Sequence, residues 1–284
     1  MHVSSVRLIL LLSVLLLSCT LLVSAEPAPN FSDLGVVIPA SSYGGEDLTG
    51  EISVIDILPL LNTSGFENVS MPASVAIVKV ESGQIFSPNA IRPSAEVLYI
   101  LSGSTQVSAD DAMVKASEGD AILVPAGSVM MVNNTGADSL TFFSILSTED
   151  GRNITGQTLM KRSPESKQPV LFGNATDSDS FTVNRMYSTF EETLPLSFDL
   201  AVATIPAGNS VSDHYMESGQ LGYVLSGTGS TTIGCESHRI AEGDITYVPP
   251  YAVQRFDASN DLKILLLTEP FYQPDKDYPS PGLC

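Results

Sequence analysis

Hydrophobic positions in this chain occur in short runs that Gly, Pro and Asp interrupt. Residues 97–101 (VLYIL), 121–124 (AILV) and 140–146 (LTFFSIL) are examples, and residues 221–225 (LGYVL) and 245–248 (ITYV) have the same character. Runs of this length, rich in Val, Ile, Phe and Tyr, are typical of β-strands. The pattern therefore predicts an all-β protein.

Two stretches of the chain follow one plan. Residues 96–130 and 220–254 align without a gap at an offset of 124 residues. The coinciding positions are Tyr99 and Tyr223, Ser-Gly at 102–103 and 226–227, Glu-Gly-Asp at 118–120 and 242–244, and Pro125 and Pro249. Such a match indicates two copies of one domain. In each copy Gly supplies the positive φ of the turns, and Pro ends a strand.

The doubled pattern resembles the cupin family of small β-barrels. That family has a first motif G-x5-H-x-H-x3/4-E-x6-G and a second motif G-x5-P-x-G-x2-H-x3-N, and the skeleton of both is present twice here. The resemblance implies two tandem cupin barrels, each a double-stranded β-helix or jelly roll.

The N-terminal residues indicate a secretory signal. Arg7, a long apolar run and Val23-Ser24-Ala25 form a charged region, a hydrophobic region and a small-residue cleavage site, so removal of residues 1–25 is expected. An uncleaved membrane anchor, or a lipoprotein box ending at Cys19, are the alternatives. No later run approaches the roughly 18 apolar residues that span a bilayer, so a secreted chain with no membrane contact after cleavage is expected.

The rest of the chain divides into four parts. An N-terminal arm covers residues 26–70, and its apolar run 52–61 is expected to add a strand to a barrel edge. The first barrel covers 71–148, an ordered and exposed linker covers 149–180, and the second barrel with its tail covers 181–284. Residues 275–284 of the tail are expected to be irregular.

Six asparagines lie in N-x-S/T frames, which suggests a glycosylated protein of a eukaryotic secretory route. They are Asn30, Asn62, Asn68, Asn133, Asn153 and Asn174. After removal of the signal, Cys235 and Cys284 remain, and in an oxidising compartment they either pair or stay free. The destination is the extracellular space or an endomembrane lumen.

The charge excludes some partners. The chain has 32 Asp and Glu against 13 Lys and Arg, a net charge of −19. Such a surface repels phosphate backbones and anionic lipids, so nucleic-acid binding is not expected. A small polar molecule is the expected partner. Assembly into a homo-oligomer through barrel-edge strands is a further possibility.

Cupins hold a metal ion with three His and one carboxylate on inward-facing strand positions. This chain has three His, and His2 leaves with the signal. At the motif positions the first copy has Asn89, Ala90, Ile91, Glu96 and Met130. With Ile91 and Met130 pointing inward, the first barrel is expected to have an apolar interior and no metal.

The second copy has His214, Met216, Gln220 and Gln254 at the motif positions. His214, Gln220 and Gln254 are candidate metal ligands, and Met216 and Tyr223 are expected to line the pocket. A slip of one residue would turn Asp213 and Tyr215 inward instead. Because adjacent strand residues face opposite sides, Asp213 and His214 are not expected both to be metal ligands. Glu217 in the next turn is a further candidate ligand, and His238 is expected at the surface.

Over most of residues 80–270 the chain also resembles the (S)-ureidoglycine aminohydrolases, which are exported bicupins with a degenerate first barrel and manganese in the second. Shared features are residues 167–169 (KQP), 194–195 (LP), Gly227 with Gly229, and Gln254 at the last ligand position. The resemblance implies a metal-dependent release of ammonia from ureidoglycine or a related compound, with Mn²⁺ or another divalent ion. The alternatives are a non-enzymatic glycoprotein cupin that binds a small ligand, and a storage or matrix protein.

Overall fold

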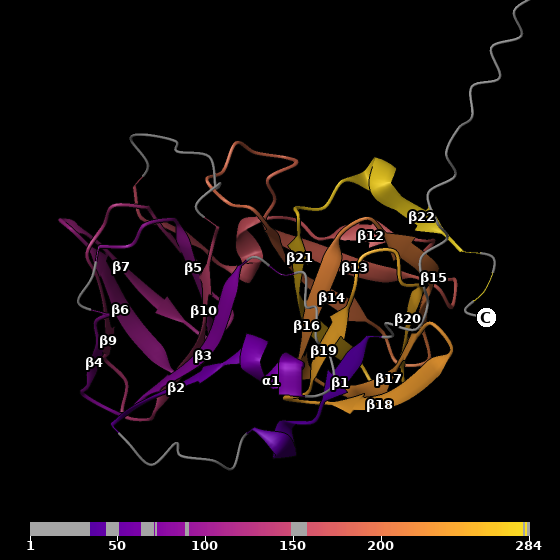
Figure 1. Ribbon diagram of the computed structural model, residues 1–284, viewed down its shortest axis with the longest axis horizontal. Coiled ribbons are helices and arrows are strands. Elements are labelled where there is room, and N and C mark those ends of the chain that lie inside the picture. The colour runs from indigo at the N-terminus through magenta and orange to yellow at the C-terminus, as the bar shows by residue number, and fades with distance from the viewer. Residues whose placement is uncertain are drawn as a thin grey trace, which may run out of the picture. The chain divides into compact units, whose positions relative to one another are not determined.

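The computed structural model describes residues 35–43, 51–63, 71, 73–88, 91–148, 158–280 and 282. The signal segment, Asn30, Asn68, Asn153 and Cys284 lie outside these residues. The described part is almost entirely β-structure, as predicted (Figure 1). Its one α-helix is α1 (Ile57–Thr63), and short 3-10 turns cover Ala40–Ser42, Pro164–Ser166 and Pro274–Lys276.

The first barrel consists of two sheets facing each other. Their strand orders are β11-β8-β5-β10-β3-β2 and β4-β9-β6-β7. The strands are β2 (Ile52–Asp56), β3 (Ser74–Val80), β4 (Ile85–Phe86), β5 (Glu96–Ser102), β6 (Ser104–Ala109), β7 (Ala112–Ser117), β8 (Ala121–Val124), β9 (Met130–Asn134), β10 (Leu140–Leu146) and β11 (Met160–Arg162).

The second barrel repeats this arrangement with sheets β1-β19-β16-β21-β14-β13-β12 and β18-β17-β20-β15-β22. The strands are β1 (Val36–Ile38), β12 (Val170–Phe172), β13 (Phe181–Tyr187), β14 (Asp199–Ile205), β15 (Ser210–Met216), β16 (Gly219–Ser226), β17 (Thr228–Ile233), β18 (Glu236–Ala241), β19 (Ile245–Val248), β20 (Gln254–Ala258), β21 (Leu262–Glu269) and β22 (Asp277–Pro279). The repeat turns at Gly103, Gly119, Gly227 and Gly243 all have positive φ, as expected.

Each barrel receives an edge strand from the segment that leads into the other. β1, from the N-terminal arm, pairs with β19 of the second barrel, and β11, from the linker, pairs with β8 of the first. Residues 36–38 and 160–162 are again 124 positions apart, so the repeat extends into both segments.

The arm and the tail differ in detail from the sequence-based expectation. The apolar run 52–61 does add strand β2 beside β3, but from Ile57 it continues as α1. Pro59 suits the first turn of a helix, and Ile57 and Leu61, four residues apart, are fully buried on one face. The tail is not irregular throughout, since residues 277–279 form β22 against β15.

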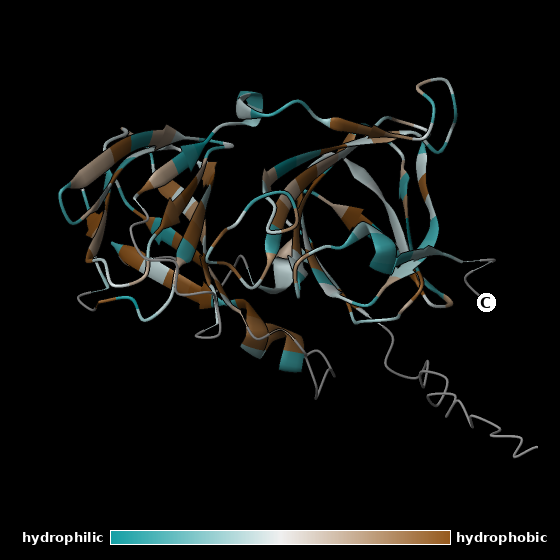
Figure 2. Cartoon of the chain, turned by 90° about the horizontal axis from the view of Figure 1, so that it is seen from above, coloured by the Kyte–Doolittle hydropathy of each residue, from teal (hydrophilic) through white to brown (hydrophobic). Residues whose placement is uncertain are grey.

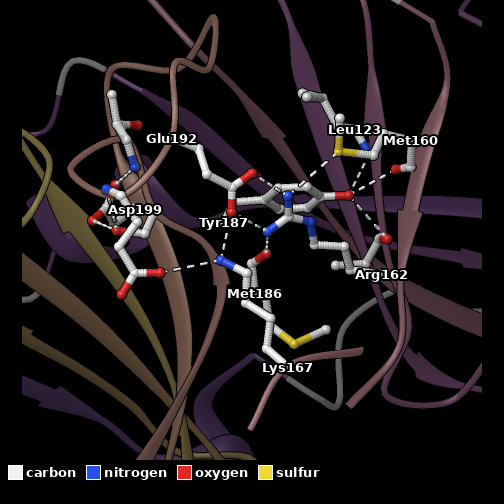
Figure 3. A network of polar contacts seen from close by, with 12 residues as sticks. Leu123, Met160, Arg162, Lys167, Met186, Tyr187, Glu192 and Asp199 are labelled. Carbon is white, nitrogen blue, oxygen red and sulfur yellow. Dashed lines mark hydrogen bonds and ion pairs between the residues drawn. The ribbon is translucent and has the colours of Figure 1, made fainter. Parts of the chain in front are cut away.

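Hydrophobic residues concentrate along the strands (Figure 2). One buried cluster joins strands of both barrels and α1, and two others lie inside the individual barrels. Tyr187 lies at the contact between the barrels (Figure 3). Its hydroxyl accepts a bond from the Leu123 N–H at 3.0 Å and donates to the Met160 carbonyl at 2.7 Å, while the Arg162 guanidinium lies 5.0 Å from its ring. Among the described residues, no helix has the length and apolar character to cross a membrane.

Candidate functional site

The second barrel encloses a cavity of about 370 Å³. Strands β13, β14, β21 and β16 of one sheet form one wall, and β15 and β20 of the other sheet form the opposite wall. Exposed residues of the β12–β13 loop, together with Ser212 and Pro279, lie at its rim.

In one row of inward positions the second barrel has smaller side chains than the first. Val78 and Phe142 of the first barrel correspond there to Ala203 and Ile264 of the second, and both of these line the cavity. In the first barrel these side chains are at most 1% exposed and pack with Met130 in one core. The first barrel is therefore filled where the second is hollow, and the expected inward position of Met130 is confirmed.

Two other motif residues of the first barrel behave differently. Ile91 does not point inward, since it is 65% exposed in the loop before β5. Glu96 is fully buried; its carboxylate lies 2.6 Å from Arg92 Nε and accepts a bond from the Ser144 hydroxyl. Burial raises the pKa of Glu96, and Arg92 and Ser144 oppose that shift. The carboxylate of Glu96 is thus engaged by Arg92 and Ser144.

A row of polar side chains lines one end of the second-barrel cavity. Asp199 on β14 is paired with Thr268 on β21, which is paired in turn with Gln220 on β16. Residues directly opposite on neighbouring strands lie side by side on one face. Gln220 is 8% exposed, and its Nε2 donates to the Thr268 hydroxyl at 3.4 Å. Within the described part of the chain, its Oε1 has no hydrogen-bond donor.

Asp199 is a buried carboxylate on the cavity wall. It accepts bonds from the Thr189 N–H at 2.6 Å and the Ser188 hydroxyl at 3.1 Å. Burial raises the pKa of Asp199 from 3.8 to about 6, although these bonds and the nearby Arg185 lower it. Arg185 also lines the cavity, but it is ion-paired with Glu191 at 2.5 Å, and its guanidinium lies 5.6 Å from the Tyr272 ring.

His214 lines the opposite wall and is paired with Gln254 on β20, which does not itself line the cavity. His214 Nδ1 lies 2.8 Å from the Ser212 carbonyl, which can only accept, so Nδ1 carries the proton. His214 Nε2 therefore accepts from Gln254 Nε2 at 3.2 Å. Gln254 is 1% exposed, and its Oε1 is buried without a partner among the described residues.

Asp213 and His214 both line the cavity, although the alternation of strand faces predicted that they point to opposite sides. A β-bulge between Val211 and His214 interrupts the alternation of faces. Met216, as predicted to face the pocket, and Gln220 line the cavity as well.

Two predicted site residues lie elsewhere. Tyr223 does not line the cavity; it is at the contact between the barrels, where its ring meets Phe143 edge-on at 5.0 Å. Glu217 also lies off the cavity, because it bonds Lys276 at 3.2 Å and the Tyr278 hydroxyl at 3.0 Å. Those two contacts lower its pKa. His238 is half-exposed on β18, 3.7 Å from Glu236.

The donors around this cavity do not fit a divalent metal ion. Such an ion needs several converging anionic or imidazole ligands. In the described ranges, no three His, Cys, Asp or Glu side chains are grouped to hold one. His214 Nε2 is engaged by Gln254, Asp213 lies 3.8 Å from Arg255, and the remaining motif positions are Met and neutral amides. The manganese site implied by the resemblance is not supported by this donor set.

Asp199, Thr268 and Arg185 were missed by the sequence motifs, because they lie on strands outside them. A weak signal for Asp199 was available. It is the only charged residue at the inward positions 199, 201, 203 and 205 of β14, and the others are Ala201, Ala203 and Ile205. A carboxylate among such residues indicates a special role.

The described sequons and cysteine have the following environments. Asn62 is exposed in α1, Asn174 is exposed in a turn where it bonds Asp177, and Asn133 is partly exposed in β9. Cys235 is disulfide-bonded. Because Cys284 lies outside the described residues, its pairing with Cys235 stays a prediction.

Comparison with known proteins identifies the domains. The cupin domain model matches residues 76–146 and 201–268, one region in each barrel. Each matched region lies within one barrel, and the fold is that of two tandem cupin barrels. No curated protein gives a significant match.

Three solved structures illustrate the likeness in fold. The "Putative Glyoxylate Induced Protein" from Pseudomonas aeruginosa has a TM-score of 0.69 at 16% identity, over 88% of this chain and 94% of that one. A variant of oxalate decarboxylase from Bacillus subtilis has 0.61 at 13%, over 86% and 78%. Vicilin from Corylus avellana (hazelnut) has 0.58 at 14%, over 77% and 81%. At these identities the likeness establishes the fold alone.

Proposed function

We propose that this protein binds a small organic molecule in the cavity of its second barrel. The observation that carries the proposal is the contrast between the two barrels. Val78 and Phe142 fill the fold in one copy, where the other copy has Ala203 and Ile264 beside a cavity. Opening a core costs stability, because the lost packing contacts are not replaced. A cavity that is kept despite this cost indicates a use for the space.

The size and lining of the cavity support this function. Small-molecule sites are typically about 300 to 1,000 Å³, mostly apolar, with a few polar groups that fix orientation. Here Ala201, Ala203 and Phe256 supply apolar wall, and the row of Asp199, Thr268 and Gln220 supplies polar groups at one end.

Metal-dependent release of ammonia from ureidoglycine has weaker support. That reaction, suggested by the resemblance, would need a divalent ion to orient the substrate and stabilise developing charge. His214 and Gln254 bond each other, and Glu217 lies off the cavity. Ligand binding is therefore the function that the geometry supports best.

The compartment is part of the proposal. The predicted signal segment and sequons, together with the disulfide-bonded Cys235, support a secreted protein, since disulfides persist in oxidising compartments. Association of copies through barrel edges has some support from edge strand β2, which exposes Ile52 and Val54.

A fragment screen by thermal shift tests the function. Ala203 is 4% exposed and lines the cavity beside Ile264, its partner on the neighbouring strand. Ala203→Phe therefore puts an aromatic ring into the cavity, as Phe142 does in the first barrel. Compounds that raise the Tm of the wild type are expected to lose at least tenfold in affinity in Ala203→Phe. Met113→Phe, at an exposed position of the first barrel, is the control and should retain binding. Hits that bind Ala203→Phe as tightly as the wild type would contradict the proposal.

A further inference from the structure

We propose that the molecule held in the second barrel is a small organic cation, an amine with an apolar body. This inference rests on the proposed function, because it specifies the ligand of the same cavity. It is carried by three features of the lining: its charge, its free hydrogen-bond acceptors, and the separation of polar and apolar walls.

The charged residues of the lining are mostly acidic. Four aspartates, Asp179, Asp199, Asp213 and Asp277, line the cavity, against Arg185 as the one permanent cation. Arg185 is compensated by Glu191 on the loop after β13. A cavity of one predominant sign concentrates ligands of the opposite sign, and the acidic whole chain adds to this effect.

The polar end of the cavity presents more acceptors than donors. Gln220 is more than nine-tenths buried and lines the cavity; its Nε2 bonds Thr268, and its Oε1 receives no hydrogen bond from a described residue. Asp199 lies two strands away in the same row, with Thr268 between them. An acceptor that receives no hydrogen bond from the protein can accept one from a bound donor. An ammonium group has three donors and no acceptor, so it matches a carboxylate, a hydroxyl and an amide oxygen.

The neighbouring wall is suited to an apolar body. Along β14 the lining continues with Ala201 and Ala203, and along β21 with Leu266 and Ile264, while Phe256 of β20 lies in the opposite wall. Near the rim, Phe172 and Phe181 stack at 4.9 Å with their rings 7° from parallel. Aromatic faces attract cations as well as apolar groups. A ligand with an amine at the polar end and a hydrocarbon or ring behind it would contact both parts.

Arg185 is the feature that favours an anion instead. Its guanidinium is held against Glu191 and over the Tyr272 ring, so a carboxylate ligand would have to compete with Glu191 and approach Asp199. These contacts favour a cationic ligand over an anionic one. The anionic alternative is tested below by the phenylacetate probe.

Calorimetric titration with three matched probes at pH 7.5 tests the inference. The probes are benzylamine, benzyl alcohol and phenylacetate, which share a benzyl group and differ in charge. The proteins are the wild type, Asp199→Asn, Ala203→Phe and Asp138→Asn. Asp138 is exposed in a turn of the first barrel, so its variant controls for the change in net charge.

Benzylamine is expected to bind the wild type at least tenfold more tightly than benzyl alcohol. Asp199→Asn should weaken benzylamine about tenfold and leave benzyl alcohol unchanged, while Asp138→Asn should alter neither. Ala203→Phe should weaken both. Another outcome is that benzyl alcohol or phenylacetate binds the wild type as tightly as benzylamine and still loses affinity in Ala203→Phe. That result would contradict the preference for a cation and agree with a ligand site in the second barrel. If none of the probes binds, or Ala203→Phe has no effect on those that do, the proposed function fails as well.

Discussion

At the scale of single residues, Asp199 shows the tension between stability and binding in this barrel. Its carboxylate is 6% exposed, and burial raises its pKa from 3.8 to about 6. When the pKa of an acid is higher in the folded state than in the unfolded state, the acid favours folding most at pH values below its unfolded-state pKa. Its contribution is lost as the pH rises from about 4 to 6. At neutral pH the folded protein therefore holds an ionised group that destabilises it.

Replacing Asp199 by Asn should stabilise the protein at pH 7.5 by roughly 2 kcal/mol, and by much less at pH 4. The Asn carbonyl can still accept from the Thr189 N–H, and the Ser188 hydroxyl can reverse to accept from the amide. Urea unfolding at the two pH values measures the change. Equal destabilisation at both values would mean that the carboxylate is needed for the fold itself.

Sequence reasoning located part of the polar site. The motif positions pointed to His214, Met216 and Gln220, which do line the cavity. The alternation of strand faces predicted that Asp213 points away from the side of His214, and this was wrong. The β-bulge that turns Asp213 towards the cavity is set by pairing with β20 and not by the local sequence. Thr268 becomes adjacent to Gln220 only through a pairing across 48 residues, which no local pattern reveals.

At the scale of elements, the long strands were predictable and the short ones were not. The apolar runs 97–101 and 245–248 lie in β5 and β19, and Pro125 and Pro249 directly follow β8 and β19. β1 and β11 have three residues each, too few to show a period of two. They exist because β19 and β8 offer open edges, and unpaired sheet edges favour pairing with an added strand.

Tyr187 stabilises one of these added strands, since its hydroxyl bonds both β8 and β11. Tyr187→Phe should lower the free energy of unfolding by about 1–3 kcal/mol, because the buried Leu123 N–H and the partly buried Met160 carbonyl lose a partner. Guanidinium unfolding measures the loss. Tyr278→Phe, whose hydroxyl bonds Glu217 near the surface, should change it by only about 0.5 kcal/mol. Equal effects of the two variants would contradict this role for Tyr187.

At the scale of the whole molecule, one duplicated fold has a filled copy and a hollow copy. The duplication is evident from the sequence, but the difference in filling is not. The offset of 124 that aligns the central repeat becomes 122 between β10 and β21, so the sequence alignment pairs Phe142 with Leu266 instead of Ile264. Only the strand register reveals that the second barrel lacks a large side chain at this layer.

The most direct test of this asymmetry is anomalous diffraction from crystals soaked in 4-bromobenzylamine. The account predicts one bromine site in the second barrel, beside Ala203, Ile264 and Phe256, with the amine directed towards Asp199 and Gln220. It predicts none inside the first barrel, where Phe142 and Leu98 fill the space. A bromine site inside the first barrel, or no site in the second, would contradict the claim that the second barrel is the ligand site of this protein.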